Sequence, residues 1–73
     1  DVAYSQFYLD NKTDVRIIIN DLSGKAIKEV FDKRLDKGDH TISLNLEGIS
    51  PGIYISSIFL GDEYFCNKFE IIK

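Results

Sequence analysis

The chain has 73 residues, with twelve Asp or Glu, nine Lys or Arg and a formal net charge of −3. A chain of this length predicts one domain, residues 1–73, with a core that contributes on the order of 3–5 kcal/mol. The acidic balance is not that of a nucleic-acid-binding protein, and no apolar run reaches the roughly 18 residues of a membrane span, so we predict no direct membrane insertion. Methionine is absent, and we therefore expect a module excised from a longer protein.

The first predicted strand, residues 2–9, is indicated by alternating side chains. One face would carry Ala3, Ser5, Phe7 and Leu9, and the other Tyr4, Gln6 and Tyr8. Tyr4 and Tyr8 would lie about 13 Å apart, which suits a platform for stacking sugars. Aromatic side chains that cover part of a sheet are the simpler interpretation. A polar segment, residues 10–13, then breaks the strand.

The second predicted strand, residues 14–21, has an apolar centre that suits the middle of a sheet. A turn follows, in which the carboxylate of Asp21 caps the backbone and Gly24 takes the left-handed conformation. The turn is not a phosphate-binding loop, because Ala26 stands where that motif needs a hydroxyl group.

Residues 26–35 fit two patterns. Ile27, Val30, Phe31 and Leu35 have helical spacing, and the Lys, Glu and Arg residues between them favour a helix. With a period of two, Ile27, Phe31 and Leu35 also share one face. The pattern alone does not decide, but the position between two strands favours an edge strand, where charged residues discourage aggregation.

Residues 36–39 form the next predicted turn, and residues 40–46 alternate as a strand. We expect His40 to be a surface residue, because no partner for general-base catalysis is evident. The acidic turn residues lack the dense spacing of a calcium loop, so we predict no metal site.

The last third of the chain gives the clearest prediction. Pro51 and Gly52 supply the φ angles that a type II turn needs at its second and third positions. Two β-branched and aromatic runs follow, joined by Gly61 and Asp62, and this loop predicts a β-hairpin with a primed turn.

In this hairpin Leu60 would face Glu63, and Tyr54 would face Phe69. The predicted core face consists of Tyr54, Ile58, Leu60, Phe65, Phe69 and Ile71. The other face is also partly apolar, so it is either covered or used to dock a partner; its apolar residues are Ile53, Ile55, Phe59, Tyr64, Cys66 and Ile72. Cys66 is the only cysteine, and we expect it to be a small buried side chain.

Turns at intervals of about 8–12 residues in a strand-rich chain predict a small antiparallel β-sandwich. Four features in order resemble the C-terminal sorting domain of the type IX secretion system, type A family. They are Asp21 to Lys25 after an apolar strand, Gly38 to Ile42, Leu46 to Tyr54, and Lys68 followed by Lys73. The resemblance extends from about Phe7 to Lys73, and it also favours a strand over residues 26–35.

The resemblance implies an all-β, immunoglobulin-like sandwich of six to seven strands that serves as a secretion signal without enzymatic activity or a cofactor. Such a domain directs a fused N-terminal cargo through the outer-membrane translocon. A sortase-like protease usually cleaves the domain and links the cargo to lipopolysaccharide, so the protein is in the periplasm in transit and then at the cell surface.

On the matching positions the resemblance assigns partner recognition to Gly52, Tyr54, Lys68 and Lys73. We expect the shape of the domain to depend on the turn residues Asp21, Gly24, Pro51 and Gly61. The family commonly has a Pro-Asn-Pro box before its first strand, and residues 1–9 contain none. The position of cleavage and the extent of the first strand therefore stay open.

Three alternatives compete with this interpretation. The first is a carbohydrate-binding or adhesive immunoglobulin-like accessory domain that stacks sugars on Tyr4, Tyr8 and Tyr64. The second is a structural immunoglobulin-like spacer. The third, an enzyme, is least favoured because no nucleophile with a base, spaced acid pair or cofactor loop is present.

Overall fold

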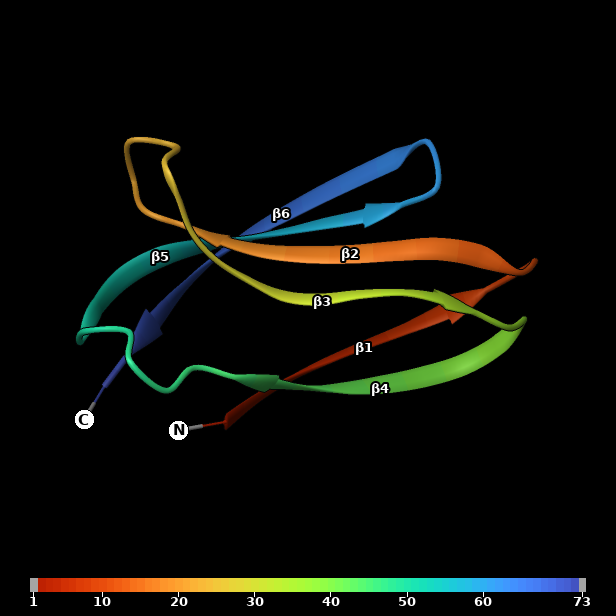
Figure 1. Ribbon diagram of the computed structural model, residues 1–73, viewed down its shortest axis with the longest axis horizontal. Helices are drawn as coiled ribbons and strands as arrows, with labels where there is room; N and C mark the ends of the chain where they lie inside the picture. The colour runs from red at the N-terminus through yellow and green to blue at the C-terminus, as the bar shows by residue number, and fades with distance from the viewer. Residues whose placement is uncertain (1, 73) are drawn as a thin grey trace.

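Six β-strands form two antiparallel sheets that face each other (Figure 1). The structure, a computed structural model, describes residues 2–72, and no helix occurs among them. β1 and β4 form a two-stranded sheet, and the other four strands are arranged in the order β3-β2-β5-β6. These sheets confirm the predicted small β-sandwich. The strands are β1 (Val2–Leu9), β2 (Thr13–Asn20), β3 (Ala26–Leu35), β4 (Gly38–Asn45), β5 (Gly52–Leu60) and β6 (Glu63–Ile71).

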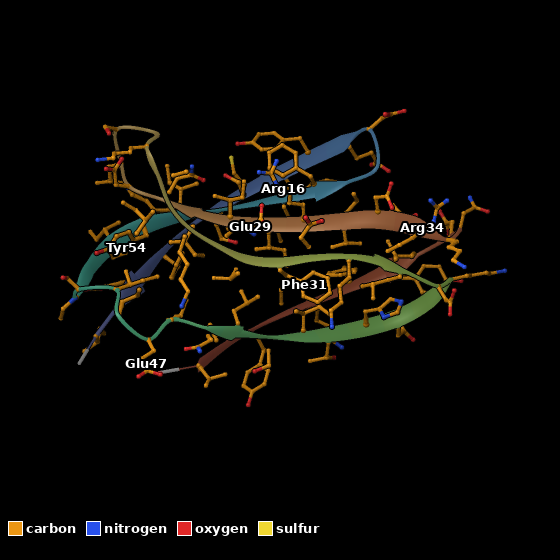
Figure 2. All side chains as sticks on the ribbon, viewed as in Figure 1. Arg16, Glu29, Phe31, Arg34, Glu47 and Tyr54 are labelled. Carbon is orange, nitrogen blue, oxygen red and sulfur yellow. The ribbon has the colours of Figure 1, made fainter. Side chains whose placement is uncertain are left out.

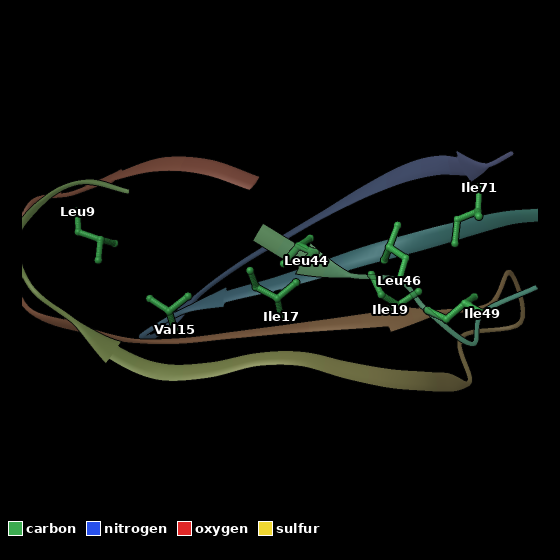
Figure 3. Close-up of a cluster of buried hydrophobic side chains, with 8 residues drawn as sticks. All are labelled: Leu9, Val15, Ile17, Ile19, Leu44, Leu46, Ile49 and Ile71. Atoms are coloured by element: carbon green, nitrogen blue, oxygen red, sulfur yellow. The ribbon is translucent and has the colours of Figure 1, made fainter. Parts of the chain in front are cut away.

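The core lies between the sheets and is centred on β2 (Figure 3). Val15, Ile17 and Ile19 are at most 1% exposed, because β2 has a hydrogen-bonded neighbour on each side and its alternate side chains point at the other sheet. Burial of one such side chain contributes roughly 1.5–3 kcal/mol. The remaining buried apolar residues are Leu9, Leu44, Leu46, Ile49 and Ile71.

The segment that fitted both helix and strand is the edge strand β3, as predicted. Its register against β2 shifts between the pairs Ile17–Phe31 and Ile18–Glu29, so Val30 is the extra residue of a β-bulge. The bulge reverses the alternation of side chains, and a second register shift follows between the pairs Ile19–Lys28 and Asn20–Ala26, which leaves Ile27 without a cross-strand partner. Ile27 therefore points to solvent and is 43% exposed, and the prediction that it shares a face with Phe31 was wrong.

The bulge also places Lys28 opposite the buried Ile19. Its ammonium group donates hydrogen bonds to the backbone oxygens of Asn45 and Glu47, with Nζ–O distances of 3.1 and 3.2 Å. These two acceptors lie at the end of β4 and in the segment after it, so Lys28 connects the two sheets along the β3 side.

The predicted hairpin is confirmed with its register, since Leu60 pairs with Glu63 and Tyr54 with Phe69. Gly61 has φ of 61°, whereas Asp62 has a negative φ, which is the combination of a type II′ turn. The N–H of Gly61 donates to the backbone oxygen of Asp14 at 3.0 Å, so the turn is also attached to β2.

The prediction of a type II turn with Pro51 and Gly52 at its centre was wrong. A type II turn lies earlier in the chain, at residues 46–49. Ile49 N donates to Leu46 O at 3.2 Å, and Gly48 supplies the positive φ of 85° at the third turn position. Ile49 is only 4% exposed, so the chain must reverse before it in order to bury that side chain. Gly52 is instead the first residue of β5, with φ of 156°.

Two further predictions for the hairpin were wrong. Phe65 was expected in the core, but it is 48% exposed. Cys66 was expected to be buried, but its side chain is exposed. Both residues lie on β6, an edge strand with a neighbour on one side only, and an edge position leaves side chains on both faces open to solvent.

Candidate recognition surface

Tyr54 holds the corner where the chain passes from β4 to β5 (Figure 2). Its hydroxyl group donates to the backbone oxygen of Ser50 at 2.7 Å, and its ring centroid lies 6.2 Å from that of Phe69. A hydroxyl bonded to the backbone just upstream is the arrangement of the tyrosine corner in immunoglobulin-like sandwiches. The ring also lies beside Gly52, where an added Cβ would be 3.5 Å from a ring carbon. Tyr54 thus uses its polar group within the molecule.

Asp21 organises the turn between β2 and β3. Its Oδ1 accepts hydrogen bonds from Ser23 Oγ at 2.6 Å, Ser23 N at 2.9 Å and Lys25 N at 3.0 Å. The Ser23 hydroxyl, followed by the Lys25 N–H, lowers the pKa of the Asp21 carboxyl below its ordinary value. Gly24 lies in the same turn with φ of 92°, a conformation that other residues rarely adopt.

Lys68 is exposed on the outer face of β6, where it pairs with Ile55 of β5. Tyr54 and its partner Phe69 lie on the inner face of the same two strands. The structure therefore places two of the predicted recognition residues, Tyr54 and Lys68, on opposite faces of one hairpin. Lys73, the fourth predicted recognition residue, lies outside the described residues.

A row of contacts crosses the outer face of the four-stranded sheet. Arg16 on β2 donates from Nε to Glu29 Oε2 on β3 at 2.7 Å (Figure 2). The guanidinium carbon of Arg16 also lies 6.0 Å from the ring centroid of Phe59 on β5, and the Phe59 ring lies 4.9 Å from that of Tyr64 on β6. One connected row of charged and aromatic groups therefore spans all four strands.

A second set of contacts lies beside this row. Ser57, which is only 5% exposed, donates from Oγ to Asn20 Oδ1 at 2.7 Å and lies 3.4 Å from the hydroxyl group of Tyr64. The same outer face also carries exposed apolar side chains such as Ile53, which is 47% exposed. Aromatic residues and arginine are enriched at protein interfaces, so this outer face has the composition of a docking surface.

The sequence indicated this surface only in part. The apolar outer face of the hairpin was predicted, whereas Arg16, Asn20 and Glu29 were missed. These three residues join the surface because β2 pairs with β5, which lies about 40 residues later in the chain. The available signal was the position of Arg16 at an outward-facing point in the apolar centre of β2.

A comparison with known protein families identifies the family of this chain. The family model described as "Secretion system C-terminal sorting domain" matches residues 3–73. The chain belongs to this family. The match confirms the predicted resemblance to type IX sorting domains over nearly the whole chain. No curated protein and no solved structure matches it.

The sorting domain does not assemble its tyrosines into one sugar-stacking platform. Tyr4 and Tyr8 are 71% and 54% exposed on the outer face of the β1-β4 sheet. Tyr64 lies on the outer face of the other sheet, next to Phe59. The carbohydrate-binding alternative named these three residues, of which only Tyr4 and Tyr8 share a face, and the family match does not favour it.

The single histidine makes local contacts. His40 is half-buried, with Nε2 2.6 Å from the backbone oxygen of Asp36 and its ring 5.9 Å from that of Phe7. Within residues 2–72, no cluster of three His, Cys, Asp or Glu side chains is placed to bind a metal ion. No helix in this part of the chain has the length and apolar character needed to span a membrane.

Proposed function

We propose that this chain directs a cargo protein, fused to its N-terminal side, across the outer membrane through the type IX secretion machinery. The observation that carries this proposal is the family match over residues 3–73, which spans all six strands. A sorting signal acts by being recognised. The exposed aromatic and charged outer face supports such a role.

Two kinds of residue serve recognition in this proposal. Gly52 and Tyr54 act through shape, because the Tyr54 hydroxyl and ring hold the corner that starts β5. Lys68 acts directly, because it is exposed on the outer face of β6, four residues along the strand from Tyr64 of the contact row. Lys73 is proposed as a second direct contact. Attraction by these lysines weakens as salt concentration rises.

The proposal includes the route and the fate of the protein. The folded domain meets the export machinery in the periplasm, and the cargo then reaches the cell surface or the medium. A sortase-like protease removes the domain or uses it for anchoring. The family relationship supports these steps, since a sorting domain implies a secreted protein that passes the outer membrane.

A reporter fusion tests the proposal. A periplasmically targeted fluorescent protein carrying residues 1–73 at its C-terminus is expressed in a bacterium with an intact type IX system and in a translocon-deficient strain. We expect surface or extracellular fluorescence only in the first strain. Retention of the reporter inside both strains, with the domain folded, would contradict the proposal.

Matched variants separate the two kinds of recognition residue. We expect Lys68→Gln to reduce export without changing the unfolding temperature, and Tyr54→Phe to reduce both. Lys33→Gln is the control, because Lys33 is an exposed lysine on β3, at the far edge of the same sheet. Equal export of the Lys68 and Lys33 variants would remove Lys68 from the recognition surface.

A further inference from the structure

The sandwich is hollow along the side formed by β1 and β6. These two strands belong to different sheets, and each has a hydrogen-bonded neighbour on one side only. Three hollows of about 180, 190 and 340 Å³ lie between them, and the hollow of about 190 Å³ shares lining residues with each of the other two. They form one groove, which extends along the length of β1. Ala3, Ile58 and Phe69 line its central part.

Apolar residues that pack against the core form much of the groove wall, together with polar side chains such as Ser5, Gln6 and Asn67. Ile58 and Phe69 pack against the buried cluster on one side and line the groove on the other. Phe65, expected in the core and found 48% exposed, lines the widest hollow. The inner face of the β5–β6 hairpin therefore extends beyond the buried core, and the part that extends is exposed to solvent.

One backbone edge of β1 also has no strand partner among residues 2–72. Edge strands are usually protected against pairing by charges, proline or a bulge. β1 has none of these: its sequence, VAYSQFYL, contains no charged residue and no proline, and its register against β4 is regular. An edge of this kind is a template for a further strand.

One end of the groove is lined by two carboxylates, whereas Glu70 alone lines the hollow at the opposite end. A hollow of about 150 Å³ adjoins the widest one through Tyr8 and Leu60, and the carboxylates of Asp10 and Glu63 line it. Neither carboxylate takes part in the ion pairs found among residues 2–72. A positive charge at this end of the groove would complement both.

We propose that the groove between β1 and β6 binds an extended strand of a partner protein, added antiparallel to β1. The strand is uncharged along its length, with alternate apolar side chains filling the hollows, and carries a basic residue at its N-terminal end. Antiparallel pairing places that end next to Asp10, at the end of β1. This inference deepens the proposed export function and rests on it for the role of the partner, whereas strand binding itself can be measured on the isolated chain.

A peptide titration tests the inference without any secretion machinery. The probe is an acetylated, amidated peptide of alternating threonine and valine, as long as β1, with one arginine added at its N-terminal end. We expect saturable changes in the backbone amide signals of β1 and β6 in nuclear magnetic resonance spectra, at peptide concentrations up to about 1 mM. Moving the arginine to the C-terminal end should weaken binding about two- to fivefold at low salt.

A pair of lysine variants provides the control on the protein. Gln6 on β1 lines the widest hollow, and Thr41 is its exposed cross-strand partner on β4. A lysine on an edge strand opposes the approach of a further strand. We expect Gln6→Lys to weaken peptide binding about tenfold and Thr41→Lys to leave it unchanged, with both variants equally stable.

Three results would overturn the inference. The first is the absence of saturable changes at β1 and β6, or changes confined to the outer face of the four-stranded sheet. The second is equal or tighter binding of the peptide with the C-terminal arginine. The third is self-association of the chain in sedimentation experiments that protects the same amides, because the occupant would then be a second copy.

Discussion

β3 forms one long side of the sandwich. It contains five charged residues and a bulge, and its Lys28 makes contacts to the other sheet. β1, on the opposite side, has no charged residue and no bulge, and it borders an apolar groove. Both are edge strands of similar length, so strand pairing by itself does not account for the difference. One edge of this sorting domain is protected against association, and the other is left able to pair.

The largest expected contrast is between two phenylalanines, one on each side. Phe31→Ala should lower the free energy of unfolding by about 2–3 kcal/mol, because Phe31 packs against the buried core. Phe65→Ala should lower it by less than about 1 kcal/mol, because Phe65 is half exposed in the groove. Urea denaturation of both variants measures the difference. Equal losses would show that the β6 side is packed as tightly as the β3 side.

The next contrast tests the contact that holds the β3 side closed. Lys28→Met should lower the free energy of unfolding by about 1–2 kcal/mol, since it removes charged hydrogen bonds to two backbone oxygens. Lys33→Met, on the same strand but exposed, should change it by less than about 0.5 kcal/mol. Thermal unfolding compares the two. A Lys28 variant as stable as the Lys33 variant would mean that packing alone closes this side.

A smaller effect is expected at the corner that joins the sheets. Tyr54→Phe keeps the ring but removes the hydrogen bond to Ser50, and should cost about 1 kcal/mol. Tyr64→Phe is the matched control, because the Tyr64 hydroxyl makes only a long contact of 3.4 Å with Ser57. If both variants unfold at the same urea concentration, the corner does not depend on the Tyr54 hydroxyl.

The smallest effect concerns the turn before β3. The pKa of Asp21 is lowered in the folded state, mainly by the Ser23 hydroxyl. Its contribution to stability is therefore present above the pKa of the unfolded chain and is lost as pH falls through the lower, folded value. Stability measured from neutral to strongly acidic pH should fall less steeply in Asp21→Asn than in the original chain. Parallel pH profiles would contradict this role.

Local patterns in the sequence predicted most of the strands. β1 and β3 have the predicted bounds, and the hairpin has its predicted register, because alternation and a glycine-led loop act over a few residues. The bulge at Val30 was not predictable in this way. It depends on which β2 residues face β3, and it exchanged the orientations of Ile27 and Lys28.

The candidate sites depend still more on contacts between distant residues. Phe65 and Cys66 have the sequence pattern of core positions, but β6 is an edge strand with no neighbour beyond it. The groove results from the separation of β1 and β6 in the two sheets, which no local pattern records. The absence of charge in β1 was visible in the sequence, but it gained its meaning only once β1 was known to be an edge.

The central claim is that the β1 side is kept open for recognition, and export of matched fusions tests it most directly. A reporter fused to the original chain, to Gln6→Lys or to Thr41→Lys is expressed in the type IX-competent host, and extracellular reporter is measured. We predict that the original chain and Thr41→Lys support export, while Gln6→Lys retains the reporter in the cells despite equal folding stability. Full export of the Gln6→Lys fusion would contradict the claim and would leave the sorting function itself intact.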